Sequence, residues 1–155
     1  MSAIVSEIVE VVVFRFSRDV PEYLLLKRAT GESLYPGVWQ IITGSMHGGE
    51  SAPQAALREL REETGLVPER LWVMPMTGSF YDHATDRVHI APFFLAQVSA
   101  PSEVRLSDEH TQYVWLGLED ARRLLIWPAQ REGLQIAHDY FASGDRASQF
   151  PLIGP

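Results

Sequence analysis

Residues Gly44–Leu66 read GSMHGGESAPQAALRELREETGL, and the interpretation of the whole chain depends on this stretch. It begins with a glycine-rich turn and continues into residues that favour a helix. Ser51 is a suitable N-cap, and Gln54 three positions later completes a capping box. Gly65 stands where a glycine in the left-handed conformation commonly ends a helix. The pattern therefore predicts one helix between these two caps.

Three carboxylates gather on this predicted helix. Glu59, Glu62 and Glu63 are spaced i, i+3 and i+4, so they share one face. Such crowding of like charge is unfavourable unless a positive charge neutralises it, and Mg²⁺ prefers carboxylate oxygens, water and phosphates. Arg58 lies four residues before Glu62 and can brace it. The alternative is a solvated acidic surface paired with Arg58 and Arg61, which is how most charge runs occur.

The stretch resembles the Nudix box, G-x5-E-x7-R-E-U-x-E-E-x-G-U, in which U is a bulky aliphatic residue. Every fixed position is matched, by Gly44, Glu50, Arg58, Glu59, Leu60, Glu62, Glu63, Gly65 and Leu66. By average residue frequencies, such a match arises by chance about once in 10⁷ chains of this length. His47 stands in a variable segment where many relatives carry an acid. We expect it to be an exposed loop residue, the alternative being a change of charge near the metal site.

The resemblance implies a hydrolase that uses Mg²⁺, with Mn²⁺ as an alternative ion. The implied metal ligands are the carboxylates of Glu50, Glu59, Glu62 and Glu63 and the backbone carbonyl of Gly44. The ions would neutralise phosphate oxygens and activate a water that attacks phosphorus, and pyrophosphate or a phosphorylated fragment would leave. The implied catalytic residues are Glu62, Glu59, Arg58 and Glu109. Arg58 would orient the carboxylates, and either Glu62 or Glu109 would be the general base. The alternative for Glu109 is a capping acid on the surface.

Shorter segments indicate a branch of the family. Trp39-Gln40 followed by Thr43-Gly44-Ser45 is similar to the WQ-x-x-TGS segment of bacterial dihydroneopterin triphosphate or dNTP pyrophosphohydrolases. Asp108-Glu109-His110 with Tyr113 and Trp115-Leu116, and Ile126-Trp127 with Arg131, are weaker similarities. They favour a (deoxy)nucleoside or dihydroneopterin triphosphate as substrate, cleaved to a monophosphate and pyrophosphate. Hydrolysis of ADP-ribose or a dinucleoside polyphosphate remains an alternative. A sensor that binds a nucleotide without cleaving it is an alternative of another class.

Five residues outside the box are candidates for binding the substrate. Lys27 and Arg28 follow an apolar run, where they would reach a phosphate or remain as solvated charges at a strand end. Tyr35 and Trp39 would line a base or pterin pocket, and packing in the core is the alternative for Trp39. Gln40 belongs to the WQ segment and completes this set.

Composition restricts the classes of partner. The 155 residues predict a single domain over 1–155, and the net charge of −7 argues against nucleic acid. There is no cysteine, so neither disulfides nor a thiolate metal site are expected. No apolar run has the length of a membrane span, and we expect a cytoplasmic protein without a membrane partner. Many relatives are dimers, which makes a homodimer an expectation from the resemblance.

The remaining pattern predicts an α/β fold. Strands are expected at residues 4–16, 22–27, 39–43, 71–80, 87–98 and 113–116, and further helices at 118–125 and from 128 to about 141. Pro92 implies an edge or a bulge within its strand. On the box helix, Ala56, Leu57 and Leu60 are expected to pack on the sheet. The tail from residue 142 to 155 has little helix signal and is expected to be loosely packed, although Phe150, Leu152 and Ile153 could dock. The family resemblance implies an α/β/α sandwich around a mixed sheet.

Overall fold

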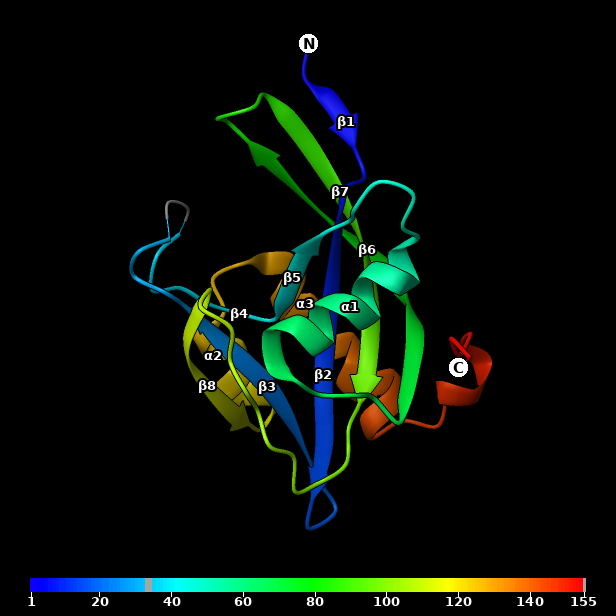
Figure 1. Ribbon diagram of the computed structural model, residues 1–155. Helices are drawn as coiled ribbons and strands as arrows, with labels where there is room; N and C mark the ends of the chain where they lie inside the picture. The colour runs from blue at the N-terminus through cyan, green and yellow to red at the C-terminus, as the bar shows by residue number, and fades with distance from the viewer. Residues whose placement is uncertain (33–34, 155) are drawn as a thin grey trace.

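The computed structural model describes residues 1–32 and 35–154, and across these residues an eight-stranded sheet forms the centre of the fold (Figure 1). Its strands are β1 (Ala3–Val5), β2 (Ile8–Ser17), β3 (Val20–Arg28), β4 (Trp39–Gln40), β5 (Ile42–Ser45), β6 (Arg70–Asp82), β7 (Arg87–Gln97) and β8 (His110–Leu116). The main path runs β1-β7-β2-β3-β4, with β5 on β2, β6 on β7 and β8 on β3. The sheet is mixed because β7 is parallel to β1 and β2 whereas the other pairs are antiparallel.

Helices cover both faces of this sheet. Helix α1 (Ala52–Thr64) packs on one face, and α2 (Leu118–Leu124) and α3 (Pro128–Ala137) pack on the other (Figure 1). Alternate residues of β2 serve the two cores: Val9, Val11 and Val13 face α1, whereas Val12 and Phe14 face α2 and α3. This alternation is the period of two that an extended strand imposes. The α/β/α sandwich with a mixed sheet is confirmed.

The ends of α1 agree with the prediction. The Ser51 side chain accepts a hydrogen bond from the Gln54 amide, and the Gln54 side chain accepts one from the Ser51 amide. Gly65 follows the helix with φ 72°, a left-handed conformation that glycine adopts without strain. The expectation for Leu57 was wrong, because this side chain is 37% exposed. The buried stripe instead follows Ala56 and Leu60, flanked by other buried positions of α1 that include Ala55 and Thr64.

Two of the expected strands are divided. The strand expected at 4–16 breaks after Val5, so that β1 pairs with residues 87–89 of β7 and β2 pairs with residues 93–97. The β6–β7 ladder shifts register between Val73 and Thr77, opposite Pro92, which confirms the bulge. The strand expected at 39–43 is also two strands, because β4 pairs with β3 and β5 pairs with β2. These strands are divided because their two parts pair with different strands or different parts of a strand, which are remote in sequence.

The chain beyond α3 folds back against β6. The expected helix to residue 141 ends as a π-helical turn at His138–Ala142, and a 3-10 turn follows at Ala147–Gln149. The Phe150 ring lies 5.2 Å from the Phe141 ring, and the Ile153 amide donates a hydrogen bond to the Leu71 carbonyl. Within residues 1–32 and 35–154, no helix is both long enough and apolar enough to cross a bilayer.

Candidate active site

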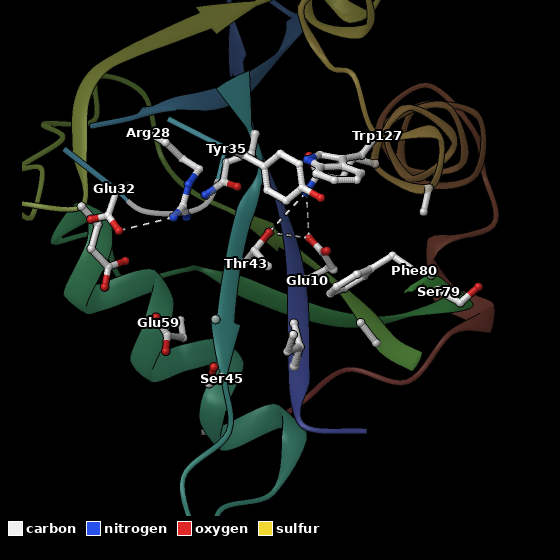
Figure 2. Close-up of a pocket in the computed structure, with 18 of the residues that line it drawn as sticks. Glu10, Arg28, Glu32, Tyr35, Thr43, Ser45, Glu59, Ser79, Phe80 and Trp127 are labelled. Atoms are coloured by element: carbon white, nitrogen blue, oxygen red, sulfur yellow. Dashed lines mark hydrogen bonds and ion pairs between the residues drawn. The ribbon is translucent and has the colours of Figure 1, made fainter. Parts of the chain in front are cut away.

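A cavity of about 550 Å³ opens beside α1 and reaches across to the start of α3. Its acidic end is formed by side chains from α1 and the loop before β8, namely Glu59, Glu62 and Glu109. Its other end is aromatic, with Tyr35, Phe80 and Trp127. Figure 2 shows Glu10 and Thr43 between these ends, with Trp127 and Phe80 on one side and Glu59 on the other. The cavity therefore combines an acidic end, which suits cations, with an aromatic end, which suits a flat ring.

Arg58 holds the acidic end together. Its Nε and Nη2 donate to Glu50 Oε1 and Oε2 at 2.7 and 2.9 Å. Its Nη1 donates to Glu59 Oε1 at 2.8 Å and to Glu62 Oε2 at 3.1 Å, and Nη2 also reaches the Ser45 carbonyl at 2.8 Å. These contacts hold the pKa of Glu50 down at about 2, with help from the His47 amide, and raise the pKa of Arg58. Arg58 is thus placed to orient carboxylates, and His47 is an exposed loop residue as expected.

Gly44 is required by the position of Glu59. A Cβ on Gly44 would collide with the Cγ and Cδ atoms of Glu59. The glycine therefore lets α1 bring this carboxylate against the backbone of β5. Burial raises the pKa of Glu59 above its ordinary value, although the hydrogen bond and charge of Arg58 oppose that rise. The Gly44 position and the Glu59 carboxylate are consequently adjacent at the acidic end.

Glu63 lies deeper than the other box acids. Only 2% of it is exposed, and among the described residues neither carboxylate oxygen has a hydrogen-bond partner. Burial, followed by the charges of Glu59 and Glu109, raises its pKa to about 9. One ligand atom from each of Glu63, Glu109 and His110 lies within 4.8 Å of the others.

These groups fit a divalent cation. Burial lowers the pKa of His110 to about 4, which leaves a neutral imidazole next to the carboxylates of Glu63 and Glu109. Carboxylate oxygens and a neutral imidazole are a donor set that suits a divalent cation, because the cation neutralises the negative charge of the ionised carboxylates. His110 Nε2 lies 3.0 Å from Gln40 Nε2, so Gln40 helps to hold the ring in place.

Sequence reasoning missed a polar cluster that we call the cavity floor, formed by Glu10, Thr43 and Gln130. Glu10 is 7% exposed, and its Oε2 accepts hydrogen bonds from Thr43 Oγ1 at 2.7 Å and Gln130 Nε2 at 3.2 Å. Burial raises the pKa of Glu10 to about 8. The available signal was a charged residue on β2 with the same parity as the buried Val12 and Phe14. Its partner Gln130 has no such signal, because it is an ordinary helix residue until α3 is placed against the sheet.

The five predicted substrate residues divide into two groups. Arg28, Tyr35 and Gln40 line the cavity, and Arg28 Nη2 lies 3.4 Å from Glu32 Oε2. Lys27 and Trp39 do not belong to the lining. The Lys27 amino group lies 5.9 Å from the centre of the Trp39 ring, and the two residues are paired between β3 and β4.

Trp39 packs against the core on the α3 side of the sheet, which was the alternative to lining a pocket. In the lining, the aromatic residues that sequence reasoning did not assign to the pocket are Phe80 and Trp127. Both lie in segments whose approach to the box depends on the fold.

Comparisons with known proteins identify the family. A model of the NUDIX domain matches residues 7–135. The chain is 33% identical over 124 residues to the asymmetrical bis(5'-nucleosyl)-tetraphosphatase of Mus musculus, covering 79% of this chain and 82% of that protein. It is 30% identical over 121 residues to nucleoside triphosphatase NudI of Escherichia coli (strain K12 / DH10B), covering 74% and 86%.

A solved structure has the same fold. The dihydroneopterin triphosphate pyrophosphohydrolase of E. coli superposes with a TM-score of 0.71 at 24% identity, over 84% of this chain and 95% of that one. The domain match covers most of the chain, and the mouse relative exceeds 30% identity over most of both proteins. The chain therefore belongs to the NUDIX domain family and is a Nudix hydrolase, an enzyme that acts on phosphoric anhydride bonds of nucleotides.

Proposed function

We propose that this enzyme is a Mg²⁺-dependent pyrophosphohydrolase that cleaves a (deoxy)nucleoside or dihydroneopterin triphosphate to a monophosphate and pyrophosphate. The observation that carries the proposal is the division of one cavity into an acidic end and an aromatic end. A triphosphate joined to a flat ring has the same two chemical parts. The similarity to a nucleoside triphosphatase supports a triphosphate as the substrate.

The acidic end would hold the divalent ions through Glu50, Glu59, Glu62, Glu63 and the Gly44 carbonyl. When bound, such ions neutralise phosphate oxygens and lower the pKa of a water molecule. Arg58 contributes by fixing three of these carboxylates, and it is not proposed to touch the substrate. Arg28 also lines the cavity and is paired with His110 between β3 and β8, where its guanidinium would contact a phosphate.

We propose Glu62 as the general base. Its side chain is 57% exposed, against 11% for Glu59, so it is the most accessible of the α1 carboxylates near Arg58. A base must lie within hydrogen-bonding reach of the proton that it removes, and an accessible carboxylate meets this need best. Glu109 lies beside Glu63 and His110, which suits a ligand of the ion better than a base.

A dinucleoside polyphosphate is the second candidate substrate, because the mouse relative acts on this class according to its name. The test is a product screen with Mg²⁺ and the dNTPs, dihydroneopterin triphosphate, ADP-ribose and a dinucleoside tetraphosphate, resolved by chromatography. We expect pyrophosphate from a triphosphate. Cleavage restricted to the tetraphosphate or ADP-ribose would overturn the substrate assignment, and binding without cleavage of any compound would indicate a sensor.

A further inference from the structure

The two carboxylate oxygens of Glu10 at the cavity floor have different surroundings. Oε2 accepts hydrogen bonds from Thr43 Oγ1 and Gln130 Nε2, at 2.7 and 3.2 Å. Among the described residues, no side chain donates to Oε1. Since Glu10 also lines the cavity, Oε1 is the atom left for a ligand.

The proton positions in this cluster follow from its hydrogen bonds. Gln130 Oε1 accepts the Ile41 amide proton at 3.2 Å, so the amide nitrogen of Gln130 must face Glu10 and Thr43 as a donor. Thr43 Oγ1 accepts from that nitrogen, and its own proton takes the short bond to Glu10 rather than the 3.4 Å contact with the Ile41 carbonyl. Both fixed donors thus point at Oε2. A proton on the Glu10 carboxyl group belongs on Oε1.

The surroundings favour the neutral carboxyl group. Glu10 is 7% exposed, and its hydrogen-bond partners Thr43 and Gln130 are uncharged. Burial of a carboxyl group without a cation disfavours its charged form, which agrees with the pKa of about 8. A neutral Glu10 offers one O–H donor toward the cavity at neutral pH.

The aromatic end lies next to this donor. The Phe80 and Trp127 rings are 6.4 Å apart between centres, and the Tyr35 ring meets Trp127 edge-on at 4.7 Å. Figure 2 shows Glu10 and Thr43 beside Trp127 and Phe80. A flat heterocycle that contacts these rings would bring one edge to Glu10 Oε1.

We propose that Glu10 is a specificity-determining residue that donates its Oε1 proton to a ring-nitrogen acceptor on the edge of the substrate's heterocycle. Adenine and cytosine present such a nitrogen beside an amino group. Guanine, thymine and a pterin lactam present an N–H at the corresponding position, so that two hydrogen-bond donors, this N–H and the Glu10 O–H, would face each other. The inference rests on the proposed function, because it assumes that the triphosphate occupies the acidic end.

The test compares hydrolysis of dATP, dCTP, dGTP and dTTP by the wild type, Glu10→Gln and Glu10→Leu. In Glu10→Gln, the donors from Thr43 and Gln130 hold the new carbonyl at the position of Oε2, so the new amide is a fixed donor at the position of Oε1. We expect kcat/KM of the wild type to be about tenfold higher for dATP or dCTP than for dGTP and dTTP, the effect of one matched hydrogen bond. Glu10→Gln should keep this ranking, and Glu10→Leu should reduce the difference to below about threefold.

Several outcomes overturn the inference. A wild-type preference for dGTP or dTTP would do so, as would a reversed ranking in Glu10→Gln or an unchanged ranking in Glu10→Leu. Competitive inhibition by inorganic tripolyphosphate, which has no heterocycle, should be equal in all three proteins. Thr43→Val replaces Glu10→Leu if the latter does not fold, and it should also weaken the preference because it frees Oε2. If no triphosphate is cleaved, dissociation constants of AMP, CMP, GMP and TMP test the same ranking separately from the proposed function.

Discussion

The guanidinium of Arg58 binds Glu50 through two parallel hydrogen bonds, from Nε at 2.7 Å and from Nη2 at 2.9 Å. Glu50 lies before α1 and Arg58 lies on its second turn, so this pair ties the loop to the helix. The same guanidinium also reaches Glu59, Glu62 and the Ser45 carbonyl. One planar group therefore sets the positions of three carboxylates at once.

Replacing Arg58 with lysine should disrupt this arrangement without removing its charge. A single ammonium cannot reproduce the paired bonds to Glu50 while also reaching Glu59 and the Ser45 carbonyl. We expect kcat/KM to fall by about tenfold or more, which corresponds to the loss of one or two charge-assisted hydrogen bonds. The apparent Mg²⁺ affinity, measured by titrating activity, should weaken. Arg61→Lys on the same helix is the control, and an equal loss there would contradict the role given to Arg58.

Substituting alanine for Gly44 should displace Glu59. The added Cβ would occupy the space of the Glu59 Cγ and Cδ atoms, and the carboxylate would have to leave its contact with Arg58. We expect kcat to fall by about a hundredfold and the melting temperature to drop by a few degrees. Gly48→Ala is a matched control, because nothing lies within 4 Å of its added Cβ. Similar kinetics for the two variants would show that the approach of Glu59 to Gly44 is unimportant.

Changing Glu62 to glutamine should affect the chemistry and spare the fold. More than half of this side chain is exposed, and its ion pair with Arg58 can be replaced by a hydrogen bond from Arg58. We expect kcat to decrease by about two to four orders of magnitude, as for the loss of a general base. The circular dichroism spectrum and melting temperature should stay close to those of the wild type. Glu132→Gln on the exposed side of α3 is the control, and unchanged kcat in Glu62→Gln would remove Glu62 from the mechanism.

Glu63 should make the metal-free protein less stable as pH rises. Its pKa is about 9 in the folded chain against 4.5 ordinarily, so the folded state binds the extra proton between these values. Glu63 does not lower the free energy of unfolding below pH about 4.5. Between pH about 4.5 and 9 it lowers the free energy of unfolding by at most about 1.4 kcal/mol per pH unit. The difference in melting temperature between Glu63→Gln and the wild type in EDTA should therefore grow from pH 5 to pH 8.

A divalent cation should reverse this loss, because it replaces the proton that Glu63 gives up. Addition of Mg²⁺ at pH 8 should raise the melting temperature of the wild type more than that of Glu63→Gln. Glu69→Gln, an exposed substitution after α1, should behave as the wild type at every pH. A difference between Glu63→Gln and the wild type that does not change with pH would contradict the assignment of the raised pKa.

The local features of α1 could be predicted from sequence, whereas the cavity floor could not. Ser51, Gln54 and Gly65 act on backbone atoms within a few residues, so the sequence contains both partners of each contact. The hydrogen bond between Glu10 and Gln130 joins residues 120 positions apart. Trp39 and Trp127 illustrate the same limit, because which of the two lines the cavity depends on how α3 meets the sheet.

The acidic end and the cavity floor draw on helices from opposite faces of the sheet. Helix α1 packs on one face, while Gln130 extends from α3 on the opposite face to meet Glu10. Substitutions at the floor can therefore accumulate during divergence without disturbing the packing of α1. If Glu10 recognises the heterocycle, a substitution there would change the substrate while the Gly44–Leu66 segment stays unaltered. The residues at positions 10, 43 and 130 should then predict the substrate of a family member better than the Nudix box does.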